Sequence, residues 1–219
     1  MTDTAPDGVG THEFAVRRSR TVYEGAILAL RVDDVVMPGG RVAEREVVEH
    51  FGAVAVVARD DRGRIAMVRQ YRHPIGHRLL ELPAGLLDQG NESPIDAARR
   101  ELAEETDLAA QRWRVLVDLD LSPGFTDEAL RLYLAEGLSA VAATERRDEE
   151  ADMSIEWVPT ADALRQVFAG EIVNATSVAG ILAVSAADRG GVELRDVDAA
   201  WRDESTAFRG RRERSERAH

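Results

Sequence analysis

Hydrophobic and polar residues alternate along most of the chain, and this pattern predicts short strands interrupted by three helices. Residues 11–49 alternate in the manner of strands, with apolar cores at 14–16, 26–32 and 45–48, and Gly39-Gly40 indicates a hairpin turn between the last two. Three short strands cannot bury much apolar surface alone. We therefore expect this segment to pack on a partner, and a second copy of the chain is the expected partner.

The remaining strands are predicted from apolar runs separated by turn residues. Residues 53–58 and 64–71 flank the polar turn 59–63, which predicts a hairpin. Further strands are expected at the positions that follow: 79–84, 113–121, 130–134 and 153–158. We expect a connecting loop over residues 122–128 and an acidic loop over residues 146–152.

Helical periodicity and capping residues mark three helices. Ser93 is a natural N-cap and Pro94 suits the first helical position of a segment that reaches Leu108. Thr160 is expected to cap a second helix, and Asn174 a third that ends near residue 188. Strands with helices between and after them predict an α/β sandwich with a mixed sheet and a small N-terminal antiparallel β appendage.

The expected organisation has four parts. Residues 1–10 are polar and are expected to be disordered, residues 11–50 form the N-terminal β region for dimerisation, residues 51–205 form the main domain, and residues 206–219 are a charged tail without structure. The first ten residues lack the apolar segment of a signal peptide, and the most apolar run, 177–187, is too short to span a bilayer. We expect a cytoplasmic protein without a membrane partner.

Charge and composition exclude several classes of function. The 219 residues include no cysteine, which excludes disulfides, thiolate metal sites and cysteine nucleophiles. The net charge of −12 argues against a nucleic-acid partner, whose phosphates would be repelled. A phosphorylated small molecule would need metal ions and a few well-placed arginines to bind.

The helix that begins at Ser93 carries a compact acidic cluster. Glu101 and Glu105 are four residues apart, so their carboxylates lie on one face about 6 Å apart along the axis, and Glu104 borders that face. Like charges at this spacing destabilise a helix, and a divalent cation such as Mg²⁺ would offset them. The alternative interpretation is a solvated acidic face partly neutralised by the neighbouring arginines.

The order of residues around this cluster resembles the Nudix box of the Nudix hydrolases. Glu92 is followed after seven residues by Arg100-Glu101-Leu102, then by Glu104-Glu105 and Leu108, with Gly85 upstream. The sequence departs from the family pattern twice: six residues rather than five separate Gly85 from Glu92, and Asp107 stands where the family has glycine. Neither departure changes a predicted metal ligand, so we expect both to be tolerated.

The resemblance implies a mixed sheet flanked by helices and a set of metal-binding residues. It implies that Glu101, Glu104 and Glu105 bind metal, that the carbonyl of Ala84 completes the metal shell, and that Arg100 pairs with Glu92 to hold the loop against the helix. Two or three Mg²⁺ ions, with Mn²⁺ as an alternative, would bridge a diphosphate and lower the pKa of a bound water that attacks phosphorus. Arg100 is counted among the catalytic residues for this supporting role, with a solvated charge as its alternative.

A general base is expected in the acidic loop 146–152. In the part of the family that hydrolyses ADP-ribose, the base often comes from a loop well after the box. Glu150 is the preferred candidate because it lies nearest the following strand, and Glu149 is the second. A solvated loop is the alternative for either residue.

Substrate-binding residues are expected by resemblance to the ADP-ribose pyrophosphatase group. The loop residues Pro123, Gly124, Phe125 and Glu128 are one set: Phe125 would stack on adenine or simply pack, and Glu128 would reach a ribose hydroxyl. Arg72 is expected near the phosphates or the terminal ribose, and Glu81 is expected to be an acid that faces the substrate. The alternative for the loop is an ordinary turn between strands.

The leading hypothesis is a Mg²⁺-dependent Nudix pyrophosphatase that cleaves ADP-ribose to AMP and ribose 5-phosphate. The first alternative is the same chemistry on another nucleoside diphosphate sugar or on a dinucleotide such as NADH. The second is a sensor that binds a nucleotide sugar without hydrolysing it, which the complete set of box carboxylates argues against. A purely structural role with a solvated acidic helix is the last.

Overall fold

The computed structural model describes residues 10–90, 92–143 and 151–217, and the chain divides into two compact units. Unit 1 contains the chain up to Phe51, the segment Leu121–Glu128, and the chain from Ser205 onward. Unit 2 contains Gly52–Asp120 and Ala129–Glu204. The loop 122–128 thus groups with the N-terminal strands, although it connects two strands of unit 2.

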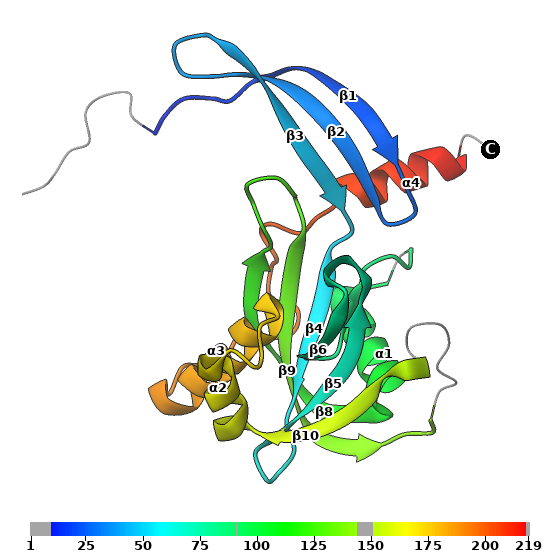
Figure 1. Ribbon diagram of the computed structural model, residues 1–219, viewed down its shortest axis with the longest axis vertical. Coiled ribbons are helices and arrows are strands. Elements are labelled where there is room, and N and C mark those ends of the chain that lie inside the picture. The colour runs from blue at the N-terminus through cyan, green and yellow to red at the C-terminus, as the bar shows by residue number, and fades with distance from the viewer. Residues whose placement is uncertain (1–9, 91, 144–150, 218–219) are drawn as a thin grey trace, which may run out of the picture. The chain divides into compact units, whose positions relative to one another are not determined.

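Unit 1 is built on an antiparallel sheet in the order β1-β2-β3 (Figure 1). Its strands are β1 (Val16–Glu24), β2 (Leu28–Val36) and β3 (Val42–His50). The predicted turn is confirmed: Gly39 and Gly40 both adopt positive φ angles between β2 and β3, a conformation that glycine adopts without steric cost. The N-terminal segment therefore does form three paired strands, but the first runs over Val16–Glu24 and shares only Val16 with the core expected at 14–16.

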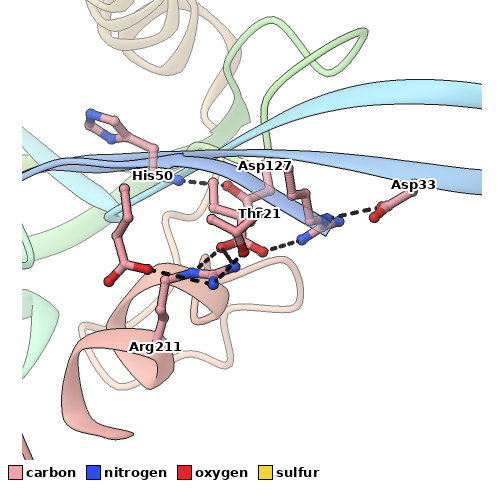
Figure 2. A network of polar contacts seen from close by, with 8 residues as sticks. Thr21, Asp33, His50, Asp127 and Arg211 are labelled. Atoms are coloured by element: carbon pink, nitrogen blue, oxygen red, sulfur yellow. Dashed lines mark hydrogen bonds and ion pairs between the residues drawn. The ribbon is translucent and has the colours of Figure 1, made fainter. Parts of the chain in front are cut away.

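The charged C-terminal segment forms a helix, α4 (Ala207–Arg217), so the expectation that it has no structure was wrong. Phe208 on this helix is fully buried and meets the ring of Phe51 edge-on at 4.8 Å. Arg211 donates to Glu49 Oε2 at 2.6 and 2.8 Å and to the Thr21 hydroxyl at 2.9 Å (Figure 2). The helix has little apolar surface and is held by the buried ring of Phe208 and by the polar contacts of Arg211, which include ion pairs to Glu49 and Glu24. The sequence of the helix does not reveal these partners.

Unit 2 contains two further sheets. The larger is mixed, with strand order β7-β4-β9-β8, and β4 runs parallel to β9 at its centre. These strands are β4 (Ala53–Ala58), β7 (Ala84–Leu86), β8 (Leu108–Asp120) and β9 (Ala129–Ala140). The smaller sheet is antiparallel in the order β10-β5-β6, from β5 (Arg64–Arg72), β6 (His77–Glu81) and β10 (Ser154–Pro159), with the short 3-10 helix η1 (His73–Ile75) between β5 and β6.

The prediction of a hairpin over residues 53–71 was wrong, because its two strands, β4 and β5, do not pair with each other. The tight turn is present, since Gly63 N donates to Asp60 O at 2.9 Å, but β4 and β5 then enter different sheets. Every residue of β4 is buried, as expected for a central strand covered on both faces. β4 pairs with β7 and β9, and the polar turn serves only to redirect the chain.

Helices cover both faces of the larger sheet (Figure 1), which confirms the α/β/α sandwich. On one face, α1 (Pro94–Thr106) packs Ala98 and Leu102 in one apolar cluster with Val54 and Val56 of β4. On the other, α3 (Ala175–Gly190) approaches so closely that a Cβ on Gly180 would lie 3.2 Å from Leu132 Cδ2 of β9 and 3.2 Å from Val57 Cγ2 of β4. The remaining helix of unit 2, α2 (Thr160–Ala169), packs on α3. Within the described ranges, no helix is long and apolar enough to cross a membrane.

Two of the three predicted helix caps are confirmed. Ser93 accepts from the Asp96 amide, and Asn174 accepts from the Ser177 amide. The prediction for Thr160 was wrong, because Pro159 is the N-cap and the Thr160 hydroxyl donates instead to the carbonyl of Gly63 at 2.8 Å. The hydroxyl that the local pattern predicted to cap the helix therefore bonds instead to Gly63, which is distant in sequence.

Candidate active site

Two acidic residues of α1, Glu101 and Glu105, are largely buried beside β7. Glu101 is 8% exposed and Glu105 is 5% exposed. The Ala84 amide of β7 donates to Glu105 Oε2 at 3.0 Å, which fixes this carboxylate against the strand. The two carboxylates therefore do not form the freely solvated acidic face that was the alternative interpretation.

Gly85 allows Glu101 to approach the backbone of β7. A Cβ at position 85 would lie 1.9 Å from Glu101 Oε1, far inside any real contact distance. The φ angle of Gly85 is not positive, so this glycine is required for space and not for an unusual backbone conformation. At the other end of α1, Asp107 adopts φ 56°, the left-handed conformation in which the family pattern has glycine.

Arg100 is the positive centre of the cluster. It donates to Glu92 at 3.0 Å through both Nε and Nη2, to Glu101 Oε1 at 2.7 Å, and to Glu104 Oε2 at 3.0 Å. The hydrogen bonds to Glu92 are the main cause of the raised pKa of Arg100. The predicted contact between Glu92 and Arg100 is therefore present. It holds the loop that precedes α1 against the helix.

Burial makes the Glu101 carboxylate costly to ionise. Desolvation raises its pKa, Arg100 lowers it, and the like charges of Glu104 and Asp88 raise it again, so that the pKa stays above its ordinary value. Added positive charge would favour the ionised form, and carboxylate oxygens are the ligands that Mg²⁺ prefers. In the part of the chain that the structure describes, however, no three or more acidic, histidine or cysteine side chains are arranged to hold a metal ion.

Arg72, the last residue of β5, extends its side chain along the adjacent antiparallel strand β6 to reach Glu81, whose register partner on β5 is Val68. Arg72 Nε donates to Glu81 Oε2 at 2.9 Å, and Gln70 Nε2 donates to the same oxygen at 2.9 Å. Asn174 Nδ2 donates to Glu81 Oε1 at 2.7 Å. Sequence reasoning singled out Arg72 and Glu81 but missed Gln70, and it assigned Asn174 only as a helix cap.

The predicted substrate loop belongs to unit 1. Phe125 O accepts from Val48 N at 2.7 Å, and Asp127 Oδ1 accepts from His50 N at 2.9 Å. Glu128 Oε1 lies 3.7 Å from His50 Nδ1, and burial raises the pKa of Glu128 despite this neighbour. Pro123, Gly124, Phe125 and Glu128 are thus grouped with the N-terminal strands, whereas the box residues lie in unit 2.

The residues proposed as general base, Glu149 and Glu150, lie outside the described residues. The same acidic loop is described from Ala151, and its Asp152 pairs with Arg78 of β6. Two nearby histidines lie in regular elements: His73 begins η1 and His77 begins β6. His77 Nδ1 contacts only the Ile75 carbonyl among the hydrogen bonds of the described chain.

Comparison with known proteins matches most of the chain. The NUDIX domain profile matches residues 49–177, and the profile of the nucleoside diphosphate sugar hydrolase N-terminal domain matches residues 15–48. An ADP-ribose pyrophosphatase of Mycobacterium tuberculosis is 56% identical over 201 residues, 92% of this chain and 97% of that protein. An ADP-ribose pyrophosphatase of Bacillus subtilis is 39% identical over 160 residues, 73% of this chain and 86% of that protein.

The fold is also found among solved structures. A crystal structure described as an ADP compounds hydrolase superposes with a TM-score of 0.71 at 20% identity, covering 83% of this chain and 98% of that one. At this level of identity the match supports the fold and nothing finer.

Proposed function

The chain belongs to the Nudix family, and from this premise we propose that it hydrolyses ADP-ribose to AMP and ribose 5-phosphate in a metal-dependent reaction. The observation that carries the proposal is the buried pair Glu101 and Glu105 on α1, held between Arg100 and β7. The 56% identity to an ADP-ribose pyrophosphatase over nearly the whole chain supports the choice of substrate.

The side chains at the box suit a divalent cation in chemical type. Glu101, Glu104 and Glu105 would hold Mg²⁺, or Mn²⁺ in its place, together with the Ala84 carbonyl, and all of these ligands are hard oxygen donors. When bound, the metal would neutralise the diphosphate and lower the pKa of a water. Arg100 holds Glu101 and Glu104 in place through hydrogen bonds of 2.7 and 3.0 Å, so it orients two of the proposed ligands.

The proposed reaction is a substitution at phosphorus. The oxygen of water forms a bond to one phosphorus as the bond from that phosphorus to the bridging oxygen breaks, and the bridging oxygen leaves with the electron pair on the second phosphate. The proton of the water passes to a carboxylate, for which Glu150 is our first candidate and Glu149 our second. Arg72, at the end of β5, would bind a phosphate or terminal ribose oxygen.

We also propose that the chain is a homodimer through the N-terminal strands. All nine residues of β1 are exposed, and β1 is an edge strand of the unit 1 sheet. Val16, Val22 and Tyr23 are exposed apolar or aromatic side chains on this strand. An edge strand of this kind offers unpaired backbone groups to another chain, and sedimentation equilibrium would measure the oligomeric state directly.

The substrate is tested by incubating the purified protein with ADP-ribose, UDP-glucose, GDP-mannose, NADH and a nucleoside triphosphate, each with Mg²⁺ and with EDTA. AMP released mainly from ADP-ribose, and abolished by EDTA, is the expected result. If another compound is hydrolysed faster, the proposed metal chemistry stands, but the proposed substrate is wrong and that compound takes the place of ADP-ribose. Measurable binding with no hydrolysis of any compound would contradict the enzyme and favour a sensor.

The metal role of Glu105 is tested by the substitution Glu105→Gln. The amide oxygen of Gln can still accept from the Ala84 amide, so the fold should be retained while the charged ligand is lost. We expect kcat to fall by at least about a hundredfold, the effect of removing one strong electrostatic group from a site of this kind. Asp96→Asn, an exposed acid in the first turn of the same helix, is the control and should keep most of the activity. Near-normal turnover by Glu105→Gln would remove the assigned role.

A further inference from the structure

Glu81 is the centre of a closed hydrogen-bond ring in unit 2. It is 2% exposed, and each of its carboxylate oxygens has a partner: Asn174 on Oε1, and Gln70 and Arg72 on Oε2. The ring closes through α3, because Ser177 Oγ donates to Asn174 Oδ1 at 3.1 Å and accepts from the Leu82 amide at 2.9 Å. The Glu81–Leu82 peptide is therefore held by the first turn of α3.

The orientation of the Asn174 amide group follows from its partners. Its Oδ1 faces the Ser177 backbone N–H at 2.9 Å, a group that can only donate. Its Nδ2 must then face Glu81 Oε1, a carboxylate oxygen that can only accept. One side chain thus caps α3 with its oxygen and fixes Glu81 with its nitrogen.

Glu81 in turn holds one edge of the Arg72 guanidinium. Arg72 Nε and Nη2 both lie 2.9 Å from Glu81 Oε2, while the Arg72 side chain is 41% exposed. Within the described residues, no hydrogen bond or ion pair involves Arg72 Nη1. A guanidinium that is hydrogen-bonded along one edge to a buried carboxylate is held in a fixed orientation. Its other edge can then bind an anion.

We propose that Asn174 is a positioning residue for substrate, which fixes Glu81 so that Glu81 aims Arg72 at an oxygen of the diphosphate. This inference rests on the proposed function for the identity of the anion. It gives Glu81 a different task from the substrate-facing acid expected by resemblance, because a carboxylate with both oxygens bonded and 2% exposure acts through Arg72.

A second arginine on the same strand provides the contrast. Arg69 is 42% exposed, nearly the same as Arg72, and its Nε donates to Glu156 Oε1 at 2.6 Å. Glu156, however, is itself 39% exposed, and within the described residues no hydrogen bond joins it to a helix. Exposure and an ion pair are common to both arginines, and only Arg72 has a carboxylate that is buried and held by a helix.

The test measures binding and turnover in variants of the full-length protein. Asn174→Ser keeps a capping oxygen for α3 but has no nitrogen for Glu81. Arg72→Ala removes the anion-binding group, and Arg69→Ala is the matched control from the same strand. Binding is measured by calorimetry with ADP-ribose in EDTA and with an analogue in Mg²⁺ whose bridging oxygen is replaced by CH₂, and kcat and KM are measured with ADP-ribose.

We expect Asn174→Ser to weaken binding and raise KM by about tenfold, the loss associated with one hydrogen bond to a charged group. Arg72→Ala should weaken binding at least as much, and Arg69→Ala should change it less than about twofold. In the Arg72→Ala background, adding Asn174→Ser should change binding by less than about twofold, because the two residues act as one unit. An equal loss in both backgrounds would mean a merely structural role and would overturn the proposal.

A readout that needs no substrate separates this inference from the proposed function. The ¹⁵Nε–H group of Arg72 should be ordered in the wild-type protein by NMR relaxation and mobile in Asn174→Ser, with the Arg69 group unchanged. An Arg72 group equally ordered in both proteins would overturn the positioning role even if ADP-ribose proves to be the substrate. If Asn174→Ser makes the Arg72 group mobile but the protein does not hydrolyse ADP-ribose, the positioning role stands and only the proposed substrate is rejected.

Discussion

At the scale of single residues, the site depends on atoms that approach unusually closely. Gly85 and Glu101 are the clearest case, because the carboxylate occupies the space in which any other residue would place its Cβ. The metal-ligand hypothesis concerns the side chain of Glu101. That side chain can occupy its position only because residue 85 is glycine and has no Cβ. Glycine at position 85 is thus required by packing, because it leaves the space for the proposed metal ligand Glu101.

Gly85→Ala tests this dependence. The added Cβ would lie 1.9 Å from Glu101 Oε1, so the carboxylate must rotate away from β7. We expect kcat/KM to fall by about tenfold to a hundredfold, as for other changes that misorient a metal ligand. Gly90→Ala, in the loop that follows β7, is the control, since nothing lies within 4 Å of the added Cβ, and it should keep its activity. Unchanged turnover in Gly85→Ala would show that the close approach has no part in function.

At the scale of elements, helix α4 shows how a segment of low hydrophobicity can be ordered. It contributes Phe208 to the contact with Phe51. It also contributes Arg211 to a polar network (Figure 2), in which Arg211 donates to the carboxylate of Glu49. Arg31 Nη1 also donates to Glu49, at 2.5 Å from Oε1. Burial alone would raise the pKa of Glu49, but the two arginines lower it below its ordinary value.

Arg211→Ala should therefore loosen α4 from the strands of unit 1. Glu49 would keep Arg31 but lose two hydrogen bonds from Arg211, and we expect a loss of about 1–3 kcal/mol, the range for truncating one partner of a largely buried charged contact. Arg212→Ala, an exposed arginine next to it on the helix, is the matched control. Amide hydrogen exchange of α4 and chemical denaturation provide the measurement, and equal exchange in the two variants would contradict the role of Arg211.

At the scale of the whole molecule, the charge of −12 includes carboxylates that are wholly or partly buried and paired with arginine. Asp118 is one of them in unit 2. Burial would raise its pKa, but hydrogen bonds from Arg131 and Arg195 outweigh this and lower the pKa below 3.8. Arg131 is itself buried, and its guanidinium also lies 4.9 Å from the ring of Trp201.

This arrangement predicts a specific loss of stability in acid. A carboxylate with a lowered folded-state pKa stabilises the fold above its unfolded pKa, near 3.8, and this stabilisation is lost as the pH falls from there through the folded value. Asp118→Asn should lower the free energy of unfolding at pH 7 by about 1–3 kcal/mol and reduce its slope below pH 4. Denaturation at pH 7 and at several values below pH 4 measures both, and an unchanged slope would contradict the assignment.

The sequence alone determined those features that depend on local pattern or on a fixed motif. The caps of Ser93 and Asn174 are correct because each uses a side chain and an amide three residues apart, and the Gly39-Gly40 turn is correct for the same local reason. The box residues on α1 identified the family because their spacing is set by one helix. Apolar runs predicted most strands of the sandwich, because a strand that is buried on one or both faces needs apolar residues at the buried positions.

Only the tertiary structure decided how distant segments meet. It separated β4 from β5, ordered α4, and grouped the loop 122–128 with the N-terminal strands. It also joined Arg72 to Asn174 through Glu81, across about a hundred residues of chain. Periodicity reports which face of an element is buried but not which partner buries it, and a buried polar group takes whichever donor the fold brings within reach. That choice of partner is the information that the linear pattern lacks.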